Sequence, residues 1–474
     1  MKGDKTKGKR DVALGSIISI VQAVACAGFL LMLSHFTGET TYTNMQFLVY
    51  GSLLFVGLNF VMMMYAKREI KKDFLKNFLV VQILLMCIVV VAEVMGIYIS
   101  PYIVPYVFLG ISVSSLISKQ LALYVNALLG IEIILVGTLL GGVSGEVFVK
   151  ALMTVIGGGL LILLQNKADS RIKTITTAIC VMPLYVGILL VAYKMGVVEP
   201  SSILFACICA ANNAIISVIL AIGLLPIFEW IFKIVTAYRV AELGDVSKGL
   251  LFELSQKAKG TYYHSVAVAN ITAECAAAIG EDAQLARVCA MYHDIGKIVE
   301  PVLFIENQNS ETGNPHDKMT PELSVALIRK HASDGAEILK KQRMPQIFVD
   351  CALQHHGTLP IRYFYERARK FSASEVDIEQ YSYNNSKPTN KISALIMICD
   401  ASEAAVRAKG SLKGEEVDAV VKSIIEERIM LEQFDECPIT FSDLHKIRET
   451  IVASFAGVMH KRISYPKLEL GEKR

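Results

Sequence analysis

Long apolar stretches alternate with short charged ones along the first half of the chain and stop near residue 235. A helix needs about 20 mostly apolar residues to cross a bilayer. Eight stretches are predicted to do so: 12–34, 46–65, 78–97, 102–118, 120–141, 147–165, 174–194 and 202–232. The fourth stretch is short, and only Ser118 and Lys119 separate it from the fifth. The pattern predicts a polytopic transmembrane helical domain over 1–235.

The second half of the chain has a different pattern. Apolar residues recur there at three- and four-residue spacing, which is typical of amphipathic helices. The predicted helices are 264–280, 283–297, 321–341, 345–356, 391–408 and 414–430, and no useful alternating strand pattern occurs. The predicted fold class is therefore all-α: a transmembrane bundle, a juxtamembrane linker helix over 236–258, a cytosolic all-helical domain over 259–465, and a polar tail over 466–474.

The amino-acid composition excludes several classes of protein and site. Of the 474 residues, 53% are hydrophobic and 19% are charged. Soluble globular proteins carry about 25% charged residues, so a fully soluble chain is excluded. The net charge of +3 is small, and we expect no nucleic-acid polymer as a partner. The ten cysteines include no Cys-x-x-Cys pair, which argues against a zinc ribbon or a disulfide framework.

Basic residues set the expected orientation in the membrane. They gather before the first predicted span and after the second, fourth and sixth: Lys2, Lys5, Lys7, Lys9 and Arg10; Lys67, Arg68, Lys71, Lys72 and Lys76; Lys119; Lys167, Arg171 and Lys173. The loops on the other side contain neither Lys nor Arg. Because cytoplasmic loops are enriched in these residues, we expect a multi-pass cell-membrane protein with both termini in the cytoplasm.

Polar residues inside the predicted spans have two interpretations. For the amides, we favour hydrogen bonding between helices; they are Gln22, Asn59, Gln82, Asn126, Asn212 and Asn213. The two carboxylates, Glu93 and Glu132, are costly in lipid and are as typical of a ligand or proton site. Their role stays open.

The histidines of the second half predict a metal site. Six of the nine fall between His264 and His356, and they include the adjacent pairs His293-Asp294 and His355-His356. Successive helical residues point about 100° apart, so a pair of neighbours can direct both side chains to one cluster. Imidazole and carboxylate ligands without thiolate suit Fe, Mn or Zn. We expect Mn or Fe.

Several motifs carry a family resemblance: Tyr263-His264-Ser265, His293-Asp294-Ile295-Gly296-Lys297, Ile305-Glu306-Asn307-Gln308, Asn314-Pro315-His316-Asp317-Lys318, His355-His356-Gly357-Thr358 and Cys399-Asp400. They resemble the HD-domain phosphohydrolases. In combination they are similar to the seven-transmembrane HD family, whose characterised members are cyclic di-AMP phosphodiesterases. The resemblance spans most of the cytosolic half.

The resemblance implies two divalent metal ions. One would be held by His264, His293, Asp294 and Asp400, and the other by His331, His355 and His356 with Asp294 bridging. Such a pair activates a water molecule for in-line attack on phosphorus. The 3′ oxygen would leave, and cyclic di-AMP would open to linear 5′-pApA.

The predicted catalytic residues are Asp294 and Lys297. Lys297 lies one helical turn after His293, where its charge would stabilise the phosphate in the transition state. Its alternative is a solvated surface lysine. The substrate contacts that we predict are Arg407, Tyr363, Tyr365 and His316. Arg407 has the alternative of pairing with Glu403, and the tyrosines have the alternative of core positions.

Two segments depart from the family pattern. Family members typically carry a large extracytoplasmic domain between the first two spans, and only residues 36–45 stand there in this chain. The loop over 377–390 lacks the Pro/Gly-rich form of the family, which puts substrate contacts from this loop in doubt.

Three other functions are kept as alternatives. The first is an HD hydrolase of cyclic di-GMP or (p)ppGpp, which the absence of a Gly-Tyr-Pro motif after His356 weakens. The second is a non-catalytic membrane nucleotide receptor, against which the complete ligand set argues. The third is a transporter with a regulatory domain, which rests on Glu93 and Glu132 alone. The oligomeric state is open, with a homodimer among the alternatives.

Overall fold

A computed structural model describes residues 2–37, 44–69, 74–141, 144–165, 171–308, 313–372, 375–410 and 414–458. Throughout these ranges the elements are helical, and the sole extended pairing is an isolated antiparallel bridge between Pro360 and Ser382. The all-α fold class is confirmed. The chain forms two compact units, Met1–Tyr238 and Arg239–Arg474, which divide close to the predicted end of the membrane domain.

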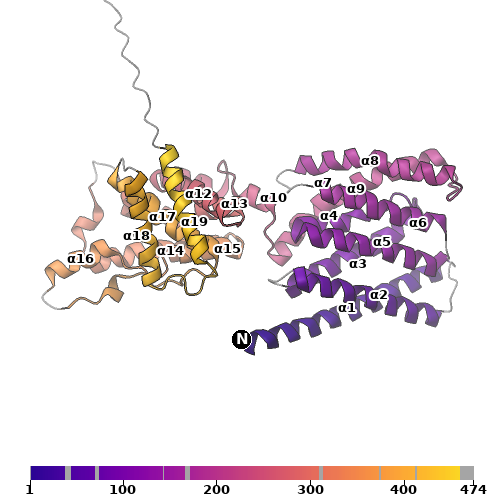
Figure 1. Cartoon of the computed structure of the whole chain (residues 1–474), viewed down its shortest axis with the longest axis horizontal. Helices are drawn as coiled ribbons and strands as arrows, with labels where there is room; N and C mark the ends of the chain where they lie inside the picture. Colours follow the sequence, from indigo (N-terminus) through magenta and orange to yellow (C-terminus); the bar gives the residue numbers. More distant parts are fainter. Residues whose placement is uncertain are drawn as a thin grey trace, which may run out of the picture. The chain divides into compact units, whose positions relative to one another are not determined.

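Apolar helices of the first unit lie side by side in Figure 1. They are α1 (Lys2–Thr37), α2 (Asn44–Glu69), α3 (Phe74–Tyr98), α4 (Val107–Leu116), α5 (Lys119–Gly141), α6 (Gly145–Leu152), η1 (Met153–Gly158), α7 (Gly159–Leu164), α8 (Arg171–Lys194) and α9 (Ile203–Phe232). The π-helical turn η1 joins α6 and α7 into one continuous helix. Six of the described helical stretches are long and apolar enough to cross a bilayer, which fits a multi-pass membrane protein.

Helix α4 differs from the predicted span over 102–118. It has 10 residues, and at 1.5 Å per residue it rises only about 15 Å, half the thickness of the hydrocarbon core. Pro105 interrupts the apolar stretch, and Pro101 precedes it, since proline disfavours helix in the residue before it. The segment between α3 and α4 is therefore irregular. The predicted loop over 36–45 lies mostly outside the described residues, and the predicted tail over 466–474 lies entirely outside them.

Several buried amides of this unit bond to another segment, as predicted, whereas Asn212 bonds within its own helix and the buried side chain of Gln22 has no partner among the described residues. Gln82 on α3 donates to Asn59 Oδ1 on α2 at 3.1 Å. Asn126 on α5 donates to the carbonyl of Thr154 in η1 at 2.9 Å. Glu132 is also buried, on α5. The side chain of Glu93 lies outside the described ones, so the roles of both carboxylates stay open.

The predicted linker helix over 236–258 is interrupted. Helix α9 ends at Phe232, and α10 (Ala237–Leu243) and α11 (Gly249–Lys257) follow as two short helices. Asp245 closes the turn between them, because its Oδ1 accepts from the backbone and the hydroxyl of Ser247 at 3.0 and 2.6 Å. Local side-chain bonds of this kind compete with a continuous helix.

In the described part of the second unit, eight longer helices and several 3₁₀ turns follow α11. The helices are α12 (Lys259–Ala278), α13 (Ala283–Tyr292), α14 (Pro321–Lys341), α15 (Gln346–Gln354), α16 (Arg362–Phe371), α17 (Lys391–Lys409), α18 (Gly414–Met430) and α19 (Phe441–Val458). The 3₁₀ turns are η2 (Ile295–Ile298), η3 (Pro301–Leu303), η4 (Ile305–Asn307), η5 (Pro315–Lys318) and η6 (Ile378–Tyr381). Six of the eight match predicted helices, while α16 and α19 were not predicted.

Asn213 on α9 generates a test of the membrane unit. Its amide donates to the carbonyl of Tyr102 at 3.2 Å and also to that of Val104, in the irregular segment before α4. In Asn213→Leu these carbonyls lose a partner where no water replaces it. We expect a loss of about 0.6–1.7 kcal/mol, seen as a lower melting temperature in detergent. Asn212→Leu is the control, because Asn212 bonds only to Ile208 of its own helix at 2.8 Å. Equal melting temperatures for the two variants would contradict the role of Asn213.

Candidate metal centre

Five elements of the second unit bring the seven predicted ligands together. Helix α12 supplies His264 and α17 supplies Asp400, while His293 and Asp294 follow the end of α13. His331 lies in α14, and the pair His355-His356 follows the end of α15. Within each of two groups the potential ligand atoms lie within 4.8 Å of one another; the groups are His264, His293 and Asp400, and Asp294, His331, His355 and His356.

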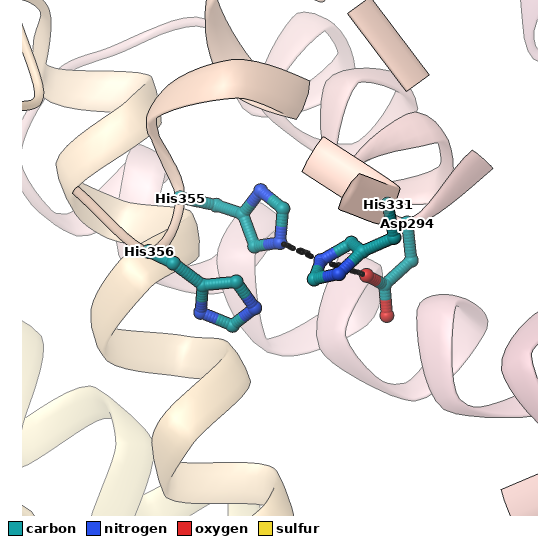
Figure 2. A group of neighbouring side chains, drawn as sticks. All are labelled: Asp294, His331, His355 and His356. Carbon is teal, nitrogen blue, oxygen red and sulfur yellow. Dashed lines mark hydrogen bonds and ion pairs between the residues drawn. The ribbon is translucent and has the colours of Figure 1, made fainter. Parts of the chain in front are cut away.

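Asp294 faces both groups at once. Its Oδ2 lies 3.3 Å from His293 Nε2 and 3.9 Å from His264 Nε2. Its Oδ1 lies 3.4 Å from His331 Nε2 and 3.6 Å from His355 Nε2. Figure 2 shows the second group, with the rings of His331 and His355 directed toward each other and toward this carboxylate. One carboxylate therefore divides its two oxygens between the two groups.

The backbone orients three of the histidines in the same way. Nδ1 of His293, His331 and His355 donates to the carbonyl three residues earlier in the chain, at 2.6, 2.6 and 2.9 Å. This bond fixes the tautomer and leaves Nε2 free to bind a metal ion. A bond to the residue three positions earlier is available wherever a histidine lies in or directly after a helix.

Unpaired polar atoms test whether a metal ion fits these residues. His293 Nε2 and Asp294 Oδ1 are buried, and no hydrogen-bond partner for either is present among the described residues. A buried polar atom without a partner is costly, so two of them in one cluster indicate a missing ligand. A divalent cation would satisfy both, and the set of imidazoles and carboxylates suits Fe, Mn or Zn.

The charges of the cluster agree with this interpretation. Burial lowers the pKa of His331 to about 3 and that of His356 well below its usual range, so both rings are neutral, as metal ligands must be. Burial opposes charge on His264 as well, but its hydrogen bonds to Asp400 and Glu403 outweigh burial and raise its pKa to about 10. The carboxylates that hold this proton also attract a divalent cation.

Lys297 is largely but not fully buried, with its side chain 12% exposed, which excludes the alternative of a solvated surface lysine. Its Nζ lies 2.8 Å from Asp294 Oδ2 and 2.9 Å from Glu306 Oε1. Burial opposes its charge, yet the two carboxylates raise the pKa of Lys297. Burial also opposes the charge on Asp294, but Lys297 and His293 hold the pKa of this carboxyl well below its usual range.

The motif around Glu306 holds Lys297 in turn. Thr261 Oγ1 donates to Glu306 Oε1 at 3.0 Å, and Asn307 Nδ2 donates to Thr261 Oγ1 at 2.8 Å. The ring of Phe304 lies 4.8 Å from the ammonium, within reach of a cation–π contact. Glu306 of the motif Ile305-Glu306-Asn307-Gln308 thus contacts the lysine that pairs with Asp294, and Asn307 supports this contact through Thr261.

Gly296 allows the two groups to approach each other. A Cβ at this position would lie 2.0 Å from the carbonyl oxygen of His331 and 2.5 Å from the nitrogen of Gly335. Any larger residue would push η2 away from α14, which carries His331. The glycine of the His-Asp-Ile-Gly motif therefore serves the geometry of the cluster.

Gln433 fixes the turn that follows His356. Its Oε1 accepts from the backbone of Thr358 at 3.0 Å, and its Nε2 donates to Thr358 Oγ1 at 2.8 Å. Gly357 has φ +53°, and a Cβ there would lie 2.2 Å from Gln433 Oε1. The sequence gives no local signal for Gln433, since 75 residues separate it from Thr358.

The four predicted substrate contacts make no described contact with the seven predicted ligands. His316 is buried and contacts the carbonyl of Leu303 at 2.9 Å. Tyr365 packs in a small apolar cluster that includes Phe364, and Tyr363 is 65% exposed. Arg407 is half exposed and lies 3.6 Å from Glu403. None of the contacts given for the described residues joins these four side chains to a predicted ligand, and their roles stay predictions.

Two residues beside the cluster were not predicted. The ring of Tyr383 stacks on His356 with centroids 4.3 Å apart and comes from the loop over 377–390, whose contribution was in doubt. Glu403 Oε2 lies 2.7 Å from His264 Nδ1. Its position three residues after Asp400 on a helix was the one available signal.

Comparisons with known proteins agree with the two units. Residues 45–236 match the model of the family described as 7TM receptor with intracellular HD hydrolase, and residues 261–405 match that of the HD domain. The cyclic-di-AMP phosphodiesterase PgpH of Listeria monocytogenes serotype 1/2a (strain 10403S) is 44% identical over 248 residues, 52% of this chain and 34% of that protein. PgpH of Bacillus subtilis (strain 168) is 40% identical over 251 residues, 53% of this chain and 35% of that protein.

The chain thus spans about a third of the length of these curated relatives. Among solved structures, the HD domain of L. monocytogenes phosphodiesterase PgpH in complex with cyclic-di-AMP is 44% identical. It aligns over 46% of this chain and 99% of that chain, with a TM-score of 0.43.

The close approach at Gly296 generates a prediction about metal binding. In Gly296→Ala, α14 must move away from η2, and His331 moves with it. We expect overpacking to lower the free energy of unfolding by about 1–3 kcal/mol. We also expect the metal affinity to fall about 10- to 100-fold, as it does when a residue that supports a metal ligand is removed. Metal titration of the full chain measures the second effect. The control is Gly414→Ala, where a Cβ would meet no atom within 4 Å. Wild-type metal affinity in Gly296→Ala would refute the argument.

Proposed function

We propose that the chain is a membrane-anchored, metal-dependent phosphodiesterase of the family of seven-transmembrane receptors with an intracellular HD hydrolase, and that it hydrolyses cyclic di-AMP to linear 5′-pApA. Such an enzyme would control the level of a second messenger. The whole-chain activity is a proposal, because the curated relatives are matched over only about a third of their length.

The shared carboxylate of Asp294 carries the proposal. A hydrolase with two metal ions needs two ligand groups close together and a ligand common to both. Asp294 directs Oδ2 toward His293 and Oδ1 toward His331, at 3.3 and 3.4 Å from the respective Nε2 atoms. We propose that His264, His293, Asp294 and Asp400 hold one ion and that Asp294, His331, His355 and His356 hold the other. Mn and Fe are the ions that we expect.

When bound, the two ions would lower the pKa of a shared water and polarise the scissile phosphodiester. In the balanced reaction, water supplies an oxygen to phosphorus and a proton to the 3′ oxygen, and the bond between phosphorus and the 3′ oxygen breaks. A linear dinucleotide with a 5′ phosphate results.

Protein residues prepare this centre. Asp294 stays ionised because Lys297 lies 2.8 Å from it. The positive charge of Lys297 would also stabilise the negative charge that builds up on a phosphate bound at this centre. Since Glu306 shares this ammonium, we propose that holding Asp294 in place is the larger part of its role. The stacked Tyr383 covers one face of His356 and restrains that ring.

The identity of the substrate rests on the relatives. Both curated relatives are named cyclic-di-AMP phosphodiesterases, and a related HD domain was solved in complex with cyclic-di-AMP. Hydrolysis of cyclic di-GMP or (p)ppGpp is the first alternative, and a receptor without turnover is the second. The complete ligand set favours catalysis over the receptor.

For the membrane unit, we propose eight crossings with both termini in the cytoplasm. The part that matches the seven-transmembrane family, 45–236, contains seven helical segments when α6, η1 and α7 are counted as one. Helix α1 precedes them. Basic residues follow α2 and precede α8, as cytoplasmic loops require.

The proposed hydrolysis is tested with the purified full chain in detergent, loaded with Mn or anaerobic Fe(II). We expect conversion of cyclic di-AMP to 5′-pApA, resolved by chromatography, and no comparable conversion of cyclic di-GMP or (p)ppGpp. His293→Ala is expected to lose metal and at least about 100-fold in rate, because it removes a ligand rather than the support of one.

His445→Ala is the matched control, since His445 is exposed on α19 and lies 3.4 Å from Glu449, outside the cluster. It is expected to keep the wild-type rate. Binding of cyclic di-AMP without turnover by the metal-loaded wild type would favour the receptor instead. Turnover of cyclic di-GMP alone would change the substrate and keep the chemistry.

The proposed number of crossings depends on whether the short helix α4 crosses the membrane. Reporter fusions after Ser100 and after Ser118 are expected on opposite sides of the membrane, with the second in the cytoplasm beside Lys119. A phosphatase reporter, active outside, and a fluorescent reporter, active inside, distinguish the two. If both fusions report the same side, α4 does not cross, and the two termini lie on opposite sides.

A further inference from the structure

His264 differs from the other oriented histidines of the cluster. The Nδ1 atoms of His293, His331 and His355 donate to neutral backbone carbonyls of residues three positions earlier. Nδ1 of His264 instead contacts a carboxylate, Glu403 Oε2, at 2.7 Å. The two ligand groups therefore have unequal support.

Glu403 is built into this position. It is buried, 7% exposed, on α17, three residues after the ligand Asp400. Its second oxygen, Oε1, lies 3.6 Å from Arg407 one turn further on. Asp400, Glu403 and Arg407 thus follow one face of α17, as residues three and four apart do. Such a buried carboxylate must be paired, and here an imidazole and a guanidinium pair it.

A carboxylate has a stronger effect on a ligating imidazole than a carbonyl has. It draws the Nδ1 proton toward itself and makes Nε2 a more basic donor to the metal, while it also fixes the plane of the ring. Nε2 of His264 lies 2.9 Å from Asp400 Oδ1, the other ligand of the same group. The negative charge of Glu403 also adds to the attraction of that group for a divalent cation.

We propose that Glu403 is a positioning residue that makes the group of His264, His293 and Asp400 the tighter of the two metal sites. This inference rests on the proposed centre with two ions. It also gives Arg407 a different role from the predicted substrate contact, because Arg407 balances the charge of Glu403. Glu403 acts through His264 and touches neither substrate nor metal.

The experiment counts metal ions rather than turnover. The full chain in detergent is titrated with Mn(II), bound metal is counted by mass spectrometry, and electron paramagnetic resonance separates a coupled pair of ions from a single one. We expect the wild type to bind two ions with a coupled signal. In Glu403→Ala we expect the affinity of the tighter wild-type site to fall about 10- to 100-fold, so that the coupled signal requires correspondingly more Mn(II) than in the wild type.

Two further variants make the outcome specific. Glu403→Gln keeps an oxygen acceptor for Nδ1 but removes the charge, so its affinity is expected between those of wild type and Glu403→Ala. Glu426→Ala is the matched control, because Glu426 is exposed on α18 and lies 3.8 Å from Lys422. It is expected to bind two ions as the wild type does.

Two results would overturn the inference. One is wild-type affinity at both sites in Glu403→Ala. The other is equal weakening of both sites in Glu403→Ala and Glu403→Gln, with unchanged helical content by circular dichroism, which would show a general structural role. A wild type that binds fewer than two ions would instead refute the proposed centre, so the two failures are distinguishable.

Discussion

The charge of Asp294 is the constraint on which the second unit depends. Its side chain is only 2% exposed, and a buried charge is very costly unless it is paired. Lys297 pairs with it on one side, and four histidines, from α12, α14 and the ends of α13 and α15, surround it on the other. Lys297 needs Glu306 as a further partner, and Glu306 needs Thr261. Much of the hydrogen bonding between α12, η2 and η4 follows from ionising this single carboxylate.

The polypeptide backbone orients several of the histidine rings in the cluster. Three of the histidines bond to carbonyls of their own helices, so the direction of each Nε2 depends on where its helix ends and how it packs. This explains why Gly296 matters although it binds nothing, since it lets η2 lie against α14. The exception, His264, takes its orientation from Glu403, a side chain on another helix. The metal centre is thus assembled by packing as well as by its ligands.

In the membrane unit, too, buried polar groups are paired, but there the partners are neutral amides and carbonyls. In lipid, no water is present to satisfy irregular backbone, so another part of the protein must do so. Asn213 donates to carbonyls of the bent segment before α4, and Asn126 donates to a carbonyl of the π-helical turn η1. Amides suit this purpose because they bond without the cost of a charge. The ion pairs described above lie in the second unit, and the amide bonds described above support the first.

The sequence by itself determined the helical class, most of the apolar spans and the seven residues that the structure gathers into two groups of potential metal ligands. These depend on local patterns: periodicity, span length, and neighbours such as His293-Asp294 that one helix end presents together. Only the tertiary structure decided that Glu403 supports His264, that Tyr383 stacks on His356 and that Glu306 shares Lys297. The first of these pairs is separated by 139 residues. The short α4 and the interrupted linker have local causes instead, Pro105 and a turn bonded by Asp245, which the hydrophobic pattern alone does not reveal. Contacts between distant segments leave no periodic trace in a sequence, because packing selects them after the helices have formed.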